Sequence, residues 1–336
     1  MRKNKLLFII TKERERNILE IKTTLVWAIV IIICSLIGIK CNINDKLSTS
    51  KMTIFILIII IIITLGGFLY FNSKSSLDRY GWVEKYMEYS RLHSLSKGKT
   101  QKIALIDSGI SEFQLNNYEK SIVLAGSDSD NNGHGTIMYS IIKGYEEKVL
   151  GISPDVEIIS IKVMDTEEKV SPNNIIKAIE KAVEEKCTII NLSIGSYKYN
   201  KDVSDIIDKA INKGITVVAS VGDYETYEML FPANKDNVIS VGSLSPNLVE
   251  SDFNNAPDEC TIIAPGDEIK GVDIQKQTIF TSGTSQATAI ISGYVALLKD
   301  YSISNGKSLN NEEIISILDK INNKQLSYAD ALLSIK

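Results

Sequence analysis

Histidine and cysteine are scarce in this chain, which has two histidines and four cysteines in 336 residues. Four cysteines far apart in the sequence are too few for a disulfide framework, so the small disulfide-stabilised folds are excluded. A net charge of -4 gives no reason to expect nucleic acid as a partner. Chemistry that needs an imidazole at neutral pH can use only His93 or His134.

Long apolar runs are confined to the start of the chain, at residues 23–39 and 52–71. A spanning helix needs about 17 to 25 residues, so the first run is near the lower limit and the second is long enough. Residues 1–22 are rich in Lys and Arg, and the loop 40–51 is less so. By the positive-inside rule both ends face the cytoplasm. The sequence therefore predicts a two-helix anchor over residues 1–72, multi-pass in the cell membrane with lipid as partner and the following domain in the cytoplasm.

A cleaved signal peptide is the alternative for the first run, although no small-x-small cleavage site follows it. If that run does not span, the rest of the chain lies outside the cell. Residues 73–98 form a polar connector with aromatic residues near helical spacing. We expect this connector to be an amphipathic helix that lies on the membrane or against the domain.

From residue 99 onward, short β-like runs alternate with helical stretches. Alternation of this kind predicts an α/β fold, with a parallel sheet flanked by helices on both faces. The strands are expected at 101–106, 156–162, 188–192, 215–221, 237–241 and 260–263, and the helices at 134–143, 172–186, 202–213, 285–299, 311–320 and 326–335.

Three short motifs carry groups suited to catalysis. Asp107 follows a predicted strand in the sequence DSG, and His134 lies between two glycines in NNGHGT. Ser285 stands in TSGTSQATA, where a helix begins. Unpaired N–H groups and the positive end of the helix dipole favour negative charge developing at such a position.

The order Asp107, His134, Ser285 is that of the subtilisin family, and further segments resemble that family in the expected order. They are GISP (151–154), NLSIG (191–195), VVASVGD (217–223), FPA (231–233), residues 237–242 and APG (264–266). The chain resembles a subtilisin-like serine peptidase over roughly residues 99–300, which predicts a peptidase domain at 99–336. The resemblance implies an endopeptidase that acts on polypeptides through an acyl-enzyme without a cofactor. Ser285 would be the nucleophile, His134 the general base and Asp107 its partner.

The same resemblance suggests how substrate binds. Ser193, Ile194 and Gly195 would offer a backbone edge to an extended peptide, in the manner of strand addition. Leu230 stands where the family often has glycine at the base of the main specificity pocket. We therefore expect a shallow pocket that prefers small P1 residues.

Asp223 departs from the family pattern, because it occupies the place of the usual oxyanion-hole Asn. An ionised carboxylate accepts hydrogen bonds but cannot donate one, and loss of one such donor costs ~10²–10³ in rate in a subtilisin. A protonated Asp223 could still act with Ser285 as the oxyanion hole. The alternative function is a catalytically weakened pseudopeptidase that binds peptides.

No metal site is expected from the sequence. Relatives outside the cell often bind structural calcium, but residues 128–132 are interpreted as a polar turn because they lack convincing ligand spacing. The four cysteines are interpreted as buried free thiols.

The natural substrate is not identified by the sequence. Two alternatives stay open, a leader peptide and a membrane-proximal protein.

Overall fold

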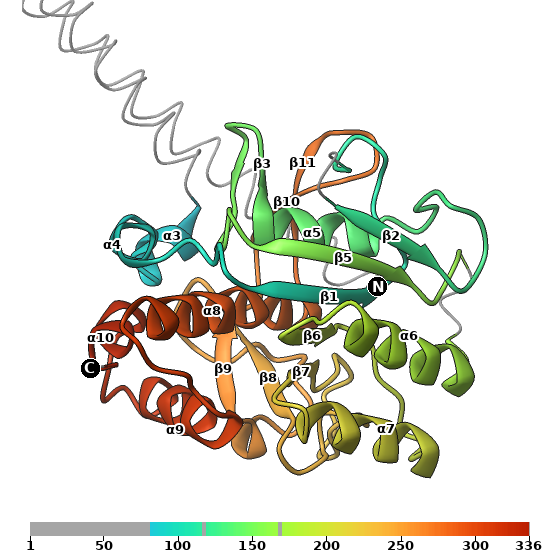
Figure 1. Cartoon of the computed structure of the whole chain (residues 1–336). Coiled ribbons are helices and arrows are strands. Elements are labelled where there is room, and N and C mark those ends of the chain that lie inside the picture. The colour runs from blue at the N-terminus through green and yellow to red at the C-terminus, as the bar shows by residue number, and fades with distance from the viewer. Residues whose placement is uncertain (1–80, 116–118, 167–169, 336) are drawn as a thin grey trace, which may run out of the picture. The chain divides into compact units, whose positions relative to one another are not determined.

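The computed structural model describes residues 81–115, 119–166 and 170–335 (Figure 1). The chain divides into two compact units, Met1–Lys74 and Ser75–Lys336. The predicted anchor, with its apolar runs at 23–39 and 52–71, lies outside the described residues. Within the described part of the chain, no helix combines the length and apolar composition that crossing a membrane requires.

The second unit is built on a seven-stranded sheet whose neighbouring strands are all parallel. The strand order is β2-β5-β1-β6-β7-β8-β9, so β1 lies near the middle (Figure 1). The seven strands are β1 (Lys102–Asp107), β2 (Lys120–Val123), β5 (Glu157–Lys162), β6 (Ile189–Leu192), β7 (Thr216–Ser220), β8 (Ile239–Leu244) and β9 (Ile262–Pro265). Parallel strands bring their carboxyl ends to one edge, where sites of α/β proteins gather.

Successive residues of β1 serve opposite faces of the sheet. Ile103 and Leu105 belong to one hydrophobic cluster, and Ala104 and Ile106 belong to another. This is the period of two that a strand imposes, and it places a hydrophobic core on each face. The confirmed architecture is therefore an α/β fold with helices covering a parallel sheet on both sides.

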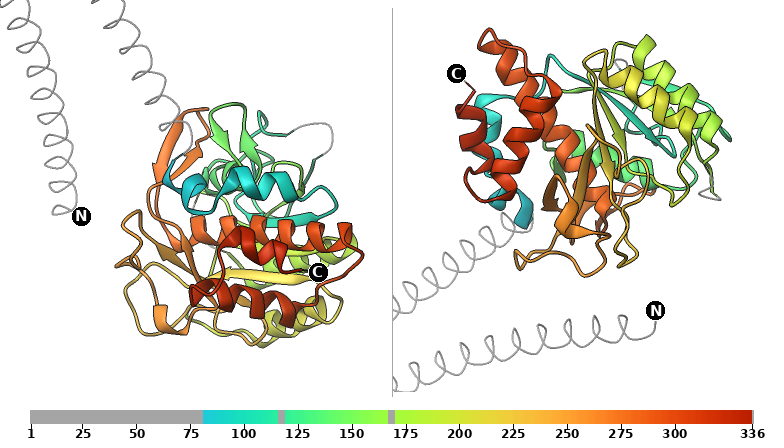
Figure 2. Two further views of the ribbon diagram at one scale, coloured as in Figure 1. Left: turned by 90° about the vertical axis from the view of Figure 1, so that its left-hand side faces the viewer. Right: turned by 90° about the horizontal axis from the view of Figure 1, so that it is seen from below.

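The helices divide between these two faces (Figures 1 and 2). The first core contains side chains of α5 (His134–Lys143), α8 (Thr284–Ser304), α9 (Asn311–Asn322) and α10 (Tyr328–Leu333), and the second contains those of α6 (Pro172–Glu184) and α7 (Lys201–Ile211). Helix α8 is buried along almost its whole length, from Thr284 to Ser302. A helix that is buried all round belongs to the interior, so its first residues are firmly placed.

The expected strands and helices are found within a few residues of their predicted bounds, but several short strands were not predicted. Strand β2 is a four-residue edge strand, exposed or half-buried throughout, and it lacks the apolar run that marks a central strand. The antiparallel pairs β3 (Gly144–Tyr145) with β4 (Val149–Leu150), and β10 (Ile269–Val272) with β11 (Thr278–Thr281), are also short.

The described part of the connector folds onto the α/β domain. Met87, which follows α3 (Trp82–Tyr86), and Leu92 of α4 (Tyr89–Leu95) are buried in the core that contains α8. The Trp82 indole N–H donates to the carbonyl oxygen of Asp267 at 3.0 Å. Of the two predicted placements for this helical segment, the described residues therefore take the one against the domain.

Candidate active site

Asp107 ends β1 and is fully buried, with 0% of its surface exposed. A buried carboxylate is costly unless hydrogen bonds satisfy it. One partner is the backbone N–H of Ser108, which donates to Asp107 Oδ1 at 2.7 Å. The other is the imidazole of His134, whose Nδ1 lies 2.8 Å from Oδ1 and 3.0 Å from Oδ2.

His134 is the first residue of α5, and its side chain is 27% exposed. Because a carboxylate only accepts hydrogen bonds, Nδ1 must carry the proton that it shares with Asp107. That pairing fixes the orientation of the ring and leaves Nε2 as the basic nitrogen of the neutral imidazole. The structure thus brings together two of the three predicted catalytic residues.

The next residue in α5 explains how helix and strand come so close. A Cβ added to Gly135 would lie 2.0 Å from the carbonyl oxygen of Gly109, which is too close for any side chain. The start of α5 therefore packs directly on the turn that follows β1. Glycine at this position permits the short distance between His134 and Asp107.

Asp130 organises this region, a role that the interpretation of residues 128–132 as a polar turn missed. Its buried carboxylate accepts five hydrogen bonds, three at Oδ1 and two at Oδ2. The donors are the Ser108 hydroxyl, the backbone N–H groups of Asn132, Gly133 and Thr136, and the Thr136 hydroxyl. The Ser108 hydroxyl also accepts from the N–H of Gly135 at 2.9 Å. Asp130 thereby ties the turn after Asp107 to the residues on both sides of His134.

Ser285 is the second residue of α8 and is partly exposed. Its hydroxyl donates to the carbonyl oxygen of Ser193 at 3.1 Å, and the Ser193 hydroxyl donates to the carbonyl oxygen of Ser285 at the same distance. Asn191 in β6 strengthens this link, since it donates to the Ser193 hydroxyl and accepts from Ser292 in α8. The nucleophile candidate is therefore held against the segment predicted to bind substrate.

The side chain of Asp223 lies against the first residue of α8. Its Oδ1 accepts a hydrogen bond from the backbone N–H of Thr284 at 2.8 Å. A carboxylate at a helix N-terminus is favoured by the helix dipole and satisfies one of the unpaired N–H groups there. The residue is exposed to the cleft, which it helps to line.

Asn255, which no motif of the sequence singled out, holds the loop that carries Asp223. It is fully buried, and its Oδ1 accepts from the backbone N–H of Tyr224 at 2.8 Å. Its Nδ2 donates to the carbonyl oxygen of Glu228 at 3.1 Å, and its backbone N–H donates to that of Gly222. Only the folded structure reveals these contacts, because they join residues about 30 positions apart.

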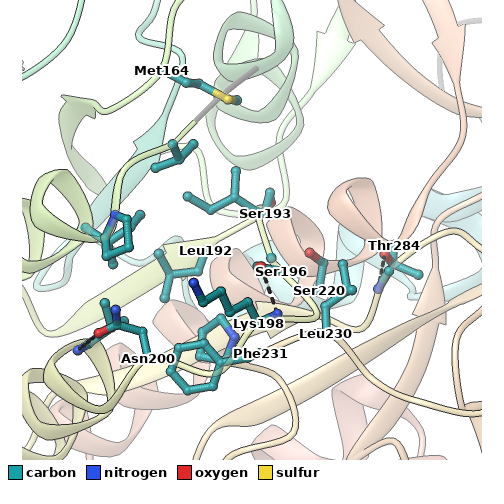
Figure 3. Close-up of a pocket in the computed structure, with 18 of the residues that line it drawn as sticks. Met164, Leu192, Ser193, Ser196, Lys198, Asn200, Ser220, Leu230, Phe231 and Thr284 are labelled. Carbon is teal, nitrogen blue, oxygen red and sulfur yellow. Dashed lines mark hydrogen bonds between the residues drawn. The ribbon is translucent and has the colours of Figure 1, made fainter. Parts of the chain in front are cut away.

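A cleft of about 660 Å³ adjoins these residues. His134, Asp223 and Thr284 line it, together with residues 192–196 and the apolar side chains of Met164, Ile175 and Phe231. Figure 3 shows lining residues from the end of β6, the end of β7 and the start of α8 around this space. The predicted substrate-binding residues Ser193, Ile194 and Gly195 are all in its wall.

Leu230 fills the part of the cleft between the segments that carry Gly195 and Gly222, and it is only 6% exposed. A Cβ on Gly195 would lie 2.8 Å from Leu230 Cβ, and a Cβ on Gly222 would lie 2.8 Å from Leu230 Cγ. The leucine thus packs directly on both backbones, in the space that a glycine would leave open. Figure 3 shows Leu230 next to Ser220 in the cleft wall.

Among the described residues, no three or more His, Cys, Asp or Glu side chains are grouped so that they could hold a metal ion. Of the four cysteines expected to be buried free thiols, Cys187 is a buried free thiol, Cys260 is a half-buried one, and Cys34 and Cys41 lie outside the described residues. Burial raises the pKa of Cys187 and of Cys260 to about 12.

The sequence matches the subtilase family over residues 98–325. The major intracellular serine protease of Bacillus subtilis (strain 168) is 31% identical over 225 residues, which cover 61% of this chain and 70% of that protein. Subtilisin DY of Bacillus licheniformis is 29% identical over 212 residues, or 60% of this chain and 77% of that protein.

Solved structures give the same fold. The structure of the prenylagaramide maturation protease PagA superposes with a TM-score of 0.63 at 27% identity, covering 74% of this chain and 98% of that one. A serine-to-alanine mutant of the protease domain of PatA superposes with a TM-score of 0.64 at 21% identity, covering 72% of this chain and 97% of that one. The second likeness shows the fold alone.

Proposed function

The chain belongs to the subtilase family of serine endopeptidases, and from this membership we propose that Asp107, His134 and Ser285 form its catalytic triad. The observation that carries the proposal is the pairing of His134 Nδ1 with both carboxylate oxygens of buried Asp107, beside a cleft. This pairing supplies an oriented base whose positive charge, once formed, is stabilised by the carboxylate.

The reaction begins when His134 Nε2 takes the hydroxyl proton of Ser285 and the Ser285 oxygen attacks the carbonyl carbon of the substrate. The C=O bonding pair moves to oxygen, near the backbone N–H of Ser285 in the first turn of α8. Collapse of this intermediate breaks the C–N bond, and His134 returns its proton to the leaving amine. Water then hydrolyses the acyl-enzyme by the same sequence of proton transfers.

Substrate binding prepares the nucleophile in this proposal. In the free protein the Ser285 hydroxyl donates to the carbonyl oxygen of Ser193. A peptide that adds as a strand along residues 193–195 would offer its own N–H to that carbonyl. The Ser285 hydroxyl would then turn from this acceptor toward His134. Hydrogen bonds of catalytic groups are commonly completed only in the substrate complex.

The substrate is a polypeptide, and the cleft supports a preference for its side chains. Leu230 packs on the backbones of Gly195 and Gly222 and so occupies the space between them. The pocket would therefore have room only for a small P1 side chain. Farther along the cleft, Met164, Ile175 and Phe231 form an apolar surface that would accept another apolar side chain.

We place this endopeptidase at the cytoplasmic side of the cell membrane, anchored by the apolar runs at 23–39 and 52–71. The charge distribution around those runs supports this placement. Similarity does not choose a side, because relatives include the intracellular protease of Bacillus subtilis and also its minor extracellular protease Epr, 30% identical over 210 residues. A reporter enzyme fused after residue 98 tests the topology, since activity of a periplasmic or extracellular reporter there would contradict it.

Maturation of a peptide precursor is the role we propose for the cleavage. The support is the similarity to PagA, whose structure is described as that of a maturation protease. Presentation of the precursor near the membrane would place its cleavage site within reach of an anchored domain. Cleavage of a leader-containing precursor at one position, rather than general degradation of unfolded protein, is the expected result.

A fluorophosphonate probe, which reacts with activated serines, tests the catalytic proposal directly. The full-length protein should be labelled, and Ser285→Ala and His134→Ala should abolish labelling because they remove the nucleophile and its base. Ser282→Ala is the matched control, since Ser282 is an exposed residue of the same turn whose hydroxyl accepts from the N–H of Glu268. Absence of labelling in the unaltered protein would instead favour a peptide-binding pseudopeptidase.

A further inference from the structure

The second donor of the oxyanion hole is missing from the side chain at position 223. The Ser285 N–H can serve as one donor, because N–H groups in the first turn of a helix have no acceptor within the helix. Asp223 already accepts from Thr284 at its Oδ1, and an ionised carboxylate has no proton to donate from Oδ2. An oxyanion beside an ionised Asp223 would be repelled unless another group intervenes.

Gln286 follows the nucleophile and has an unusual environment. It is 4% exposed, and its Nε2 donates to the Thr281 hydroxyl at 2.8 Å. Its Oε1 is buried without a hydrogen-bond partner among the described residues. A buried amide oxygen left unpaired is unfavourable, so it calls for a functional or structural explanation.

The unpaired end of Gln286 and the second oxygen of Asp223 share the space beside Gly283. The position that a Cβ on Gly283 would occupy lies 2.6 Å from Gln286 Oε1 and 2.8 Å from Asp223 Oδ2. Glycine keeps this space open, two residues before Ser285. Two acceptor oxygens that face one space repel each other, whereas an N–H in the place of either would attract the other.

We propose that the side-chain amide of Gln286 supplies the second donor of the oxyanion hole, an assignment that rests on the proposed catalytic role of Ser285. Rotation of the amide by 180° exchanges Nε2 and Oε1 with almost no change in shape. Oε1 then accepts from the Thr281 hydroxyl, which can donate as well as accept. Nε2 turns toward the space beside Gly283 with two N–H groups, one for Asp223 Oδ2 and one for the substrate.

This arrangement gives the two unusual residues complementary roles. Asp223 caps α8 through Thr284, and in this proposal its Oδ2 also orients the rotated amide of Gln286. When Ser285 attacks, the electron pair that moves to the carbonyl oxygen meets the N–H groups of Ser285 and Gln286. No bond of Gln286 forms or breaks, and the proton still travels from Ser285 through His134 to the leaving amine.

Gln286→Met tests the proposal, because methionine has similar length and no donor. We expect kcat for a peptide substrate to fall ~10²-fold with KM unchanged, since the lost hydrogen bond forms only in the transition state. Asp223→Asn in the Gln286→Met background should restore most of this loss, because the new amide at 223 can donate. Gln101→Met is the matched control, as Gln101 is similarly buried but precedes β1, and its amide donates to the Thr100 hydroxyl.

Two results would overturn the assignment. One is an unchanged kcat in Gln286→Met; the other is a loss that Asp223→Asn does not restore, which would indicate a merely structural role. If Gln286→Met does not fold, the pH profile of the unaltered enzyme decides. A kcat that falls with rising pH there but not in Asp223→Asn would identify protonated Asp223 as the donor instead. Lack of both hydrolysis and probe labelling in the unaltered protein would refute the catalytic proposal itself.

Discussion

Leu230→Ala should let the P1 pocket, for which we propose a preference for small residues, accept large ones. The leucine is 6% exposed and packs against the backbones of Gly195 and Gly222. Alanine keeps Cβ and removes the part of the side chain that reaches Gly222, where the Leu230 Cγ would be 2.8 Å from an added Cβ. The space so released lies between the segments that carry Gly195 and Gly222.

The expected gain in kcat/KM for a P1 Phe substrate can be estimated from the free energy of transferring an aromatic side chain out of water. Burying a Phe side chain contributes about 1.5–3 kcal/mol, and each 1.4 kcal/mol changes a rate ratio about tenfold. The ratio of kcat/KM for P1 Phe over P1 Ala should therefore rise by roughly 10- to 150-fold. Truncation of a buried leucine also costs about 2–5 kcal/mol of stability. We expect the lower end for Leu230, because the cleft that it borders is open to solvent.

The assay compares two peptides that differ only at P1, with Ala or Phe, at substrate concentrations well below KM. Leu248→Ala is the control, since Leu248 is 53% exposed and does not line the cleft. Thermal unfolding of both variants separates loss of stability from change of specificity. The reasoning is refuted if the unaltered enzyme already prefers Phe, or if Leu230→Ala leaves the ratio unchanged.

Three further predictions concern buried groups. Asp130→Asn should destabilise the protein by about 1–3 kcal/mol and lower kcat about tenfold, because one amide oxygen cannot accept all five hydrogen bonds around His134; unchanged unfolding and turnover would contradict this. Burial raises the pKa of Glu84 from 4.5 to about 7, so its protonated form stabilises the folded state. That contribution, up to about 3 kcal/mol, is complete below pH 4.5 and is lost as pH rises through 7. Denaturant unfolding should show this loss between about pH 4.5 and 8 in the unaltered protein and not in Glu84→Gln; equal pH dependence would refute it. Because burial raises the pKa values of Cys187 and Cys260 to about 12, peptide mapping after iodoacetamide treatment of the native protein at about pH 8 should find both unmodified, and rapid modification of either would refute its raised pKa.

Much of the fold follows from local patterns. Apolar runs such as that of β1 predicted central strands because both faces of the sheet are covered, and α6 and α7 lie within two residues of their expected bounds. Strand β2 escaped prediction because an exposed edge strand of four residues has no such signal. The connector offered two placements from sequence, and its contacts with Asp300 of α8 and with Asp267 are tertiary.

Part of the candidate site could likewise be predicted from local motifs, and part could not. The motifs singled out Asp107 and His134, and the structure places them 2.8 Å apart. Asp130 was assigned to a polar turn, since an aspartate in a loop of polar residues gives no sign of burial. The one local signal was its position four residues before His134. Asn255 and the surroundings of Gln286 depend on contacts with residues far away in the chain or across a turn.

The sequence by itself determined the fold class and the order of the reactive groups, because strand and helix periods and the motifs around Asp107, His134 and Ser285 are local features of the chain. Tertiary structure alone decided that Leu230 closes the space between Gly195 and Gly222, and that Gln286 and Asp223 meet beside Gly283. The physical reason is that hydrogen bonding and packing depend on distances of a few ångströms between side chains from separate elements. Those distances are fixed only when the sheet and its helices pack together.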